Sequence, residues 1–100
     1  MRVYVSSPNS AFSPQILAYA EYRLFAALAR YAGVQNARVV LQSDAQGAVR
    51  CSVTIEFDSA DSVRARVTGR NAAGTIDRAA ERVVQLMLRR FQPEIAAASN

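Results

Sequence analysis

A chain of 100 residues, of which 51% are hydrophobic, is long enough for one folded domain and too short for two. It has no apolar run near the roughly 18 to 20 residues of a membrane span and no apolar signal-peptide core, so we expect a soluble cytoplasmic protein with no membrane partner. The 12 basic residues, all arginine, exceed the 8 acidic ones, and the excess arises within residues 62–90, which hold seven arginines and two acids. A one-sided basic surface favours an anionic partner, most commonly nucleic acid.

A short strand and a helix are the first expected elements. Residues 2–5 alternate polar and apolar side chains, which predicts a strand with its valines facing the core. Ser13 is a suitable N-cap for a helix, and Pro14 suits its first position because the first turn leaves its N–H groups unpaired anyway. We expect this helix to end at Gly33, since a C-cap often requires the left-handed conformation that glycine adopts readily.

Three strands are expected next, with no helix between them. Residues 37–43, 48–57 and 62–69 are rich in β-branched side chains and are separated by turn-like sequences. The second and third runs alternate apolar with polar residues, which is typical of an antiparallel sheet with one face on a core and the other in water. Cys51 is in register with the apolar residues, so we interpret it as a small buried side chain and not as a reactive thiol.

The last expected element is an amphipathic helix at residues 72–91, capped by Asn71. Pro93 should stop it, and residues 92–100 should form a flexible tail. The order β-α-β-β-β-α predicts an α+β fold, in which a four-stranded mixed sheet carries two helices packed on one face. Residues 1–91 would then form a single domain.

Several kinds of active site are excluded by the residue types present. The chain has no histidine and one cysteine, which excludes zinc sites of the Cys/His kind and catalysis by Ser-His-Asp or Cys-His. It also lacks a glycine-rich phosphate loop. Of the carboxylate pairs, Asp58 and Asp61 fit a turn, whereas Asp77 and Glu81 fit contacts with arginines of their own helix. We therefore expect no enzymatic activity, no cofactor, no metal and no small-molecule substrate.

Arginines of the two helices could instead bind an anion. On the second helix, Arg78, Arg82 and Arg89 lie within about 40° of one another on a face without acidic residues. Their mutual repulsion would be relieved by a phosphate backbone that accepts charge-assisted hydrogen bonds from them. On the first helix, Arg23 and Arg30 are seven residues apart and could extend the same basic strip.

A second group of arginines alternates along the outward face of the predicted strands. We favour ordinary solvated residues with cross-strand pairing near Glu56, and the alternative is a secondary surface for RNA or a partner. The group comprises Arg2, Arg38, Arg50, Arg64 and Arg66. Tyr19 and Tyr22, near Arg23 on the first helix, could stack on RNA bases or simply shield the helix surface.

The stretch VTGRNAAGTIDRAAERVVQLMLRR resembles the ribosome hibernation promoting factor family, also called ribosome-associated inhibitor or sigma-54 modulation proteins. In that family the last strand runs through a glycine-containing turn into a helix that begins near an A-I-D sequence and continues as a basic amphipathic stretch. Here Gly69, Asn71 and the pair Ile76 and Asp77 occupy those positions. The β-α-β-β-β-α order is that of the same family.

Residues 30–42 also match the family's junction between the first helix and a V-V-L strand. The resemblance covers residues 1–91. It implies a domain that binds 16S rRNA of the 30S subunit in the channel for mRNA and tRNA and holds ribosomes inactive in stationary phase or under stress. Carried over residue by residue, the RNA-binding positions are Arg23, Arg30, Arg78, Arg82, Arg89 and Arg90. The chain resembles the short forms, in which pairing of ribosomes would require an additional dimerising factor. An alternative function is a protein-interaction or self-association module on the same fold.

Overall fold

Six elements follow one another in the expected order in a computed structural model that describes residues 1–9 and 12–98, with side chains in the last helix described through residue 90. They are β1 (Arg2–Ser6), α1 (Pro14–Leu28), β2 (Val34–Ser43), β3 (Val49–Phe57), β4 (Ser62–Gly69) and α2 (Ala72–Ala98). The α+β class and the β-α-β-β-β-α order are therefore confirmed.

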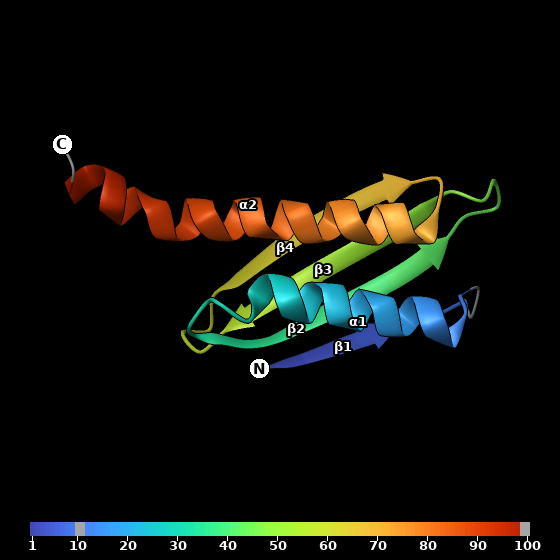
Figure 1. Ribbon diagram of the computed structural model, residues 1–100, viewed down its shortest axis with the longest axis horizontal. Coiled ribbons are helices and arrows are strands. Elements are labelled where there is room, and N and C mark those ends of the chain that lie inside the picture. The colour runs from blue at the N-terminus through green and yellow to red at the C-terminus, as the bar shows by residue number, and fades with distance from the viewer. Residues whose placement is uncertain (10–11, 99–100) are drawn as a thin grey trace.

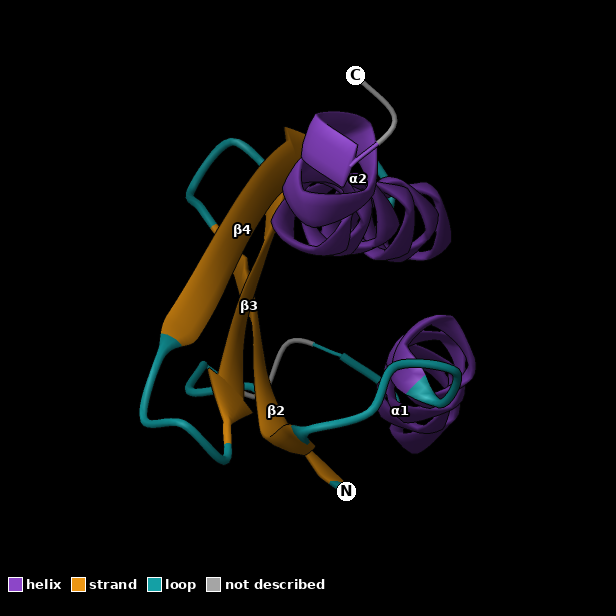
Figure 2. Ribbon diagram, turned by 90° about the vertical axis from the view of Figure 1, so that its left-hand side faces the viewer, coloured by secondary structure: helices purple, strands orange, loops and turns teal. Residues whose placement is uncertain are grey.

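The four strands form one mixed sheet in the spatial order β1-β2-β3-β4. β1 and β2 are parallel and are joined through α1, while β2, β3 and β4 form an antiparallel meander. Both helices cover the same face of the sheet, as Figure 1 and Figure 2 show from two directions, and within the described residues the opposite face carries no helix. This arrangement matches the predicted two-layer architecture.

The core lies between the sheet and the two helices. Leu24 and Leu28 of α1 are 0% exposed, as are Ile76, Val83 and Met87 of α2. They pack on the apolar residues that alternate along the strands. The buried strand residues are Val34, Ala37, Val39, Leu41, Val49, Cys51, Val53, Ile55, Phe57 and Ala65.

Cys51 is buried within this core, as predicted. Burial raises the pKa of its thiol to about 11, because an apolar environment disfavours the thiolate. The thiol therefore stays protonated near neutral pH and behaves as a small hydrophobic side chain.

Both predicted N-caps are present. Ser13 Oγ accepts a hydrogen bond of 3.2 Å from the Ile16 N–H, and Asn71 Oδ1 accepts one of 2.7 Å from the Gly74 N–H. A Cβ atom at Gly74 would lie 2.9 Å from Asn71 Oδ1, so the absence of a side chain leaves room for this cap. The glycine that weakens the first turn of α2 thus also permits its capping.

The two helix ends differ from the predictions. α1 ends at Leu28 with Ala29 as C-cap, not at Gly33, because the chain already turns where the Tyr31 N–H donates to the Leu28 carbonyl. Gly33 lies beyond that turn with a φ of +84° and leads into β2. Its left-handed conformation was thus predicted correctly, but it serves the loop and not the helix.

α2 continues through Pro93 to Ala98, whereas the sequence predicted an end near Phe91. Proline removes one N–H donor, and this loss does not end the helix here, where glutamate and three consecutive alanines, all good helix formers, follow within five residues. Side chains beyond residue 90 and residues 99–100 lie outside the described part. The flexible tail expected at 92–100 therefore stays a prediction.

Candidate nucleic-acid interface

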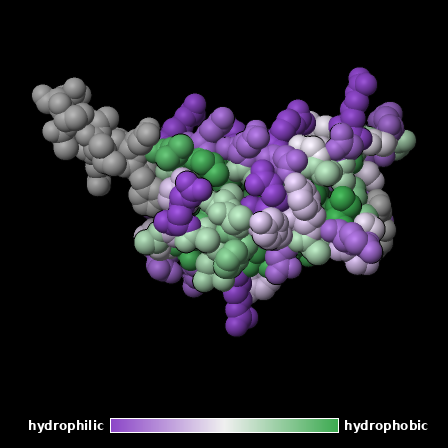
Figure 3. Space-filling model, viewed as in Figure 1, coloured by the Kyte–Doolittle hydropathy of each residue, from purple (hydrophilic) through white to green (hydrophobic). Residues whose placement is uncertain are grey.

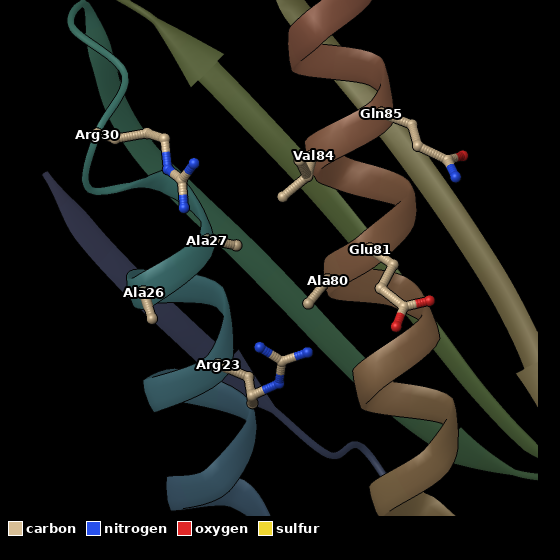
Figure 4. A pocket seen from close by; sticks show the side chains of 8 residues that line it. All are labelled: Arg23, Ala26, Ala27, Arg30, Ala80, Glu81, Val84 and Gln85. Carbon is tan, nitrogen blue, oxygen red and sulfur yellow. The ribbon is translucent and has the colours of Figure 1, made fainter.

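A groove runs between α1 and α2 on the helical side of the molecule. It has a volume of about 470 Å³. Figure 4 shows Ala27, Ala80 and Val84 pointing between the helices, while the guanidinium groups of Arg23 and Arg30 reach from the α1 side toward α2. Small side chains thus form the floor and charged ones the rim. The full lining is Arg23, Ala26, Ala27, Arg30, Ala80, Glu81, Val84 and Gln85.

Arg23 is fixed by a contact between the two helices. Its Nε lies 3.0 Å from Asp77 Oδ1, and the Tyr19 hydroxyl donates a hydrogen bond of 2.5 Å to the same oxygen. Asp77 was expected to contact arginines of its own helix, and that prediction is wrong: the partners lie on α1. The packing of α1 beside α2 brings these partners within reach of Asp77. A helical wheel of α2 alone does not show that packing. Arg23 therefore reaches the groove with its charge partly balanced.

The same contact favours the shielding role of Tyr19 over base stacking, because it holds a half-buried ring against α2. Tyr22, by contrast, is 67% exposed on α1, so its ring is open to solvent. The two tyrosines, which the sequence placed together, thus have different surroundings. Of the pair, Tyr22 alone keeps the exposed ring that stacking on a base would need.

Stability is expected to decrease in acid partly through Asp77. Hydrogen bonds from Tyr19, which has the larger effect, and from Arg23 hold the pKa of this carboxyl below its ordinary value. A carboxylate whose pKa is lowered by folding stabilises the fold above its unfolded pKa, near about 3.9, and this stabilisation is lost as the pH falls through the folded pKa. We expect the stability difference between the wild-type protein and Asp77→Asn to shrink from about pH 6 to about pH 2, measured by urea unfolding. A difference independent of pH would contradict this assignment.

The arginines on the outer face of α2 differ in how free they are. Arg78 donates a hydrogen bond of 2.5 Å to the Thr68 carbonyl, which ties it to the end of β4. Arg82 is exposed and makes one hydrogen bond of 3.3 Å to the uncharged Gln85. Arg89 is exposed and has no ion pair within the part of the chain that the structure describes. Arg82 and Arg89 are therefore the most available cations of this face.

Arg90 lies apart from this stripe. Its Nη2 is 2.8 Å from Asp61 Oδ2, and its guanidinium carbon lies 4.2 Å from the centroid of the Phe57 ring. The hydrogen bond from Arg90, with a second from Ser59, holds the pKa of Asp61 below its ordinary value. Arg90 therefore links α2 to the end of the sheet, and its charge is largely balanced there.

Arg30 follows the end of α1 and is exposed at the rim of the groove. Like Arg89, it makes no ion pair among the described residues. We use the term helix surface for the five arginines on this side of the molecule. They are Arg23, Arg30, Arg78, Arg82 and Arg89. Figure 3 shows this side, with hydrophilic side chains gathered over α2 beside an apolar area.

The predicted secondary residues do not form one site. Arg50, Arg64 and Arg66 are exposed on the open face of the sheet, whereas Tyr19 and Tyr22 belong to α1 on the other side. The structure thus brings Arg23 and Arg30 to the groove, leaves Arg78, Arg82 and Arg89 on the outer face of α2, and places the strand arginines on the opposite face of the sheet. The groove itself was not predicted from the sequence, and its one signal was the presence of alanines at positions where two helices could meet.

Among the side chains of residues 1–9 and 12–90, no group of three or more His, Cys, Asp or Glu is placed to hold a metal ion. Within the same described ranges, neither helix combines the length and apolar character that crossing a membrane requires.

Comparison with known proteins gives one family match and several similar structures. The model of the sigma 54 modulation protein / S30EA ribosomal protein family matches residues 3–92. No curated protein sequence matches significantly. A ribosomal subunit interface protein from Coxiella burnetii is similar in structure, with a TM-score of 0.78 and 10% identity over 89% of this chain and 96% of that one.

The N-terminal domain of Protein Y from Thermus thermophilus is also similar, with a TM-score of 0.70 and 22% identity over 88% of this chain and 93% of that one. At these identities the two structures establish the fold alone, and the family match, which spans nearly the whole domain, establishes membership. The chain belongs to the sigma 54 modulation protein / S30EA ribosomal protein family.

Proposed function

We propose that this protein is a cytoplasmic, non-enzymatic hibernation factor whose helix surface binds 16S rRNA in the decoding channel of the 30S subunit. Its bulk would exclude tRNA and mRNA from the channel and so hold ribosomes inactive in stationary phase or under stress. The observation that supports this most directly is the set of exposed arginines on the helical side of the molecule, Arg30, Arg82 and Arg89, which make no ion pair among the described residues.

Phosphate is the anion that fits these side chains best. Residues 14–30 and 72–90 contain six arginines and three acids, so the helical side carries an excess of positive charge. Arginines held close together on a helix repel one another by a few tenths of a kcal/mol per pair. A phosphate between them replaces that repulsion with charge-assisted hydrogen bonds, which are about twice as strong as neutral ones. The RNA backbone presents such phosphates at regular intervals and requires no base specificity from the protein.

Sedimentation of a stationary-phase lysate at low salt tests this proposal. We expect the protein to migrate with 30S and 70S particles, and a protein that stays at the top of the gradient would contradict the function. The salt dependence then identifies the chemistry of the contact. With about four phosphate contacts, affinity should fall about 100-fold between about 50 and 200 mM salt. A nearly constant affinity would instead indicate an apolar protein interface and favour the interaction-module alternative.

A further inference from the structure

The face of the sheet opposite the helices, which Figure 2 shows without a helix on it, carries a second set of arginines. We infer that this face is a second RNA-binding surface, so that the domain is held between two RNA segments, one against the helices and one against the sheet. The inference rests on the proposed function for the identity of the RNA. We use the term sheet surface for the outward arginines of the four strands, which are Arg2, Arg38, Arg50, Arg64 and Arg66.

The charge on this face is almost unopposed. Across the outward positions of the strands, the five arginines face one acidic residue, Glu56. Glu56 pairs with Arg38 at 3.0 Å, as expected from the sequence, and this accounts for a single arginine. Asp44 shares a hollow with Arg50, but its Oδ1 accepts hydrogen bonds from two backbone N–H groups of the β2–β3 turn. Cross-strand pairing with acids therefore explains one arginine of the five.

The strand register places hydroxyl groups opposite the free arginines. Arg66 of β4 lies opposite Ser52 of β3, and Arg64 lies opposite Thr54. These four side chains line a hollow of about 380 Å³ on the sheet. Guanidinium and hydroxyl groups are the donors that most often contact phosphate and sugar oxygens. The two neighbouring arginines repel each other unless an anion lies between them.

A second hollow on the same face adds an aromatic ring. It has a volume of about 490 Å³ and lies where β1 and β2 pair, with Tyr4 in register with Arg38. Tyr4 is 49% exposed, and an exposed aromatic ring on a strand offers a stacking platform for an unpaired base. Arginines that follow the backbone, combined with an aromatic ring that receives a base, are typical of surfaces that bind single-stranded RNA.

An apolar protein partner fits this face less well. Tyr4 and Val40 are its only sizeable apolar side chains, and the remaining outward positions of the four strands are polar or charged. Protein interfaces usually have an apolar centre from which charged residues are depleted. The excess of arginine therefore favours a polyanion, and the combination of hydroxyl groups and Tyr4 favours RNA.

Two variants with the same net charge test the inference. The affinity of each is measured for 30S subunits and for protein-free 16S rRNA. The sheet variant is Arg64→Gln with Arg66→Gln, and the helix variant is Arg82→Gln with Arg89→Gln. Each loses two exposed positive charges, so we expect each to bind 30S subunits about 20-fold more weakly near 0.1 M salt. The plot of log affinity against log salt should become shallower by about 1.4 for each variant, and the sheet variant should lose affinity for naked 16S rRNA as well.

Single substitutions provide a control for charge alone. Arg70 is exposed between β4 and α2, where it borders a hollow with Arg78 and lies outside the sheet surface, so Arg70→Gln should lose less affinity than Arg66→Gln, which should lose about fivefold. Equal losses for both would overturn the inference. Thermal unfolding establishes that each variant is folded, and Arg50→Gln on β3 replaces the sheet variant if that variant is unstable.

The remaining outcomes separate this inference from the proposed function. Wild-type 30S affinity of the sheet variant, together with a weak helix variant, would overturn the second surface and leave the proposed function intact. Wild-type affinity of both variants would overturn both. If the sheet variant loses 30S affinity but binds naked 16S rRNA as the wild type does, the sheet contacts a ribosomal protein, and the inference of RNA is overturned.

Discussion

Reversing the charge of two arginines, Arg82→Glu with Arg89→Glu, is expected to abolish co-sedimentation with 30S subunits while the domain stays folded. Both side chains are exposed on α2, and neither makes an ion pair among the described residues, so their replacement breaks no ion pair within that part of the chain. Each substitution removes a phosphate contact and adds a repelling carboxylate. We expect a loss of about 100-fold or more in affinity near 0.1 M salt.

The choice of these two positions comes from the structure. Arg78 belongs to the same stripe, but its hydrogen bond to the Thr68 carbonyl means that Arg78→Glu would also disturb the junction of β4 and α2. Arg90→Gln is an informative comparison, because this side chain is engaged by Asp61 and Phe57. It should lower the stability more than the ribosome affinity. The prediction fails if the double charge reversal leaves co-sedimentation unchanged in a protein with a wild-type unfolding transition.

Periodicity was sufficient to predict the layers of the fold. A two-residue alternation identified β3 and β4 and the side of each that is buried, since register follows from the hydrophobic pattern wherever one face meets a core. Ser13 and Asn71 could also be predicted as caps, because a cap satisfies N–H groups within a few residues of itself. These features depend on neighbours in the sequence.

The features that the sequence did not predict depend on distances between elements. Asp77 could have paired with several arginines, and its choice of Arg23 follows from how closely α1 packs beside α2. Arg90 fits the same helical wheel as its neighbours, yet the end of the sheet brings Asp61 and Phe57 within its reach. The sequence therefore predicted which arginines are outward, and the packing decided which of them remain available to an anion.

Gly69→Ala is expected to destabilise the protein by about 1–3 kcal/mol, because it overpacks the junction that orients α2. A Cβ atom at Gly69 would overlap the Thr75 hydroxyl and lie 2.7 Å from Arg78 Nη2. The arginine is exposed and can move, although its Nη2 then loses the hydrogen bond to the Thr68 carbonyl. Thr75 is 1% exposed, and its Oγ1 donates a hydrogen bond of 2.6 Å to the Asn71 carbonyl, so it cannot move without losing that contact.

A double-mutant cycle with Thr75→Ala locates this strain. The single Thr75→Ala change removes one hydrogen bond and should cost about 1 kcal/mol. In the combined variant the new methyl group at position 69 occupies space that the hydroxyl has left. The stability lost by the combined variant should therefore be smaller, by about 1 kcal/mol, than the sum of the losses of the two single variants. Urea unfolding of the four proteins measures the coupling, and strictly additive losses would show that Thr75 is not what excludes a side chain from position 69. Since Arg78 reaches back across this same glycine to β4, the space at position 69 also helps fix where the arginine stripe of α2 begins.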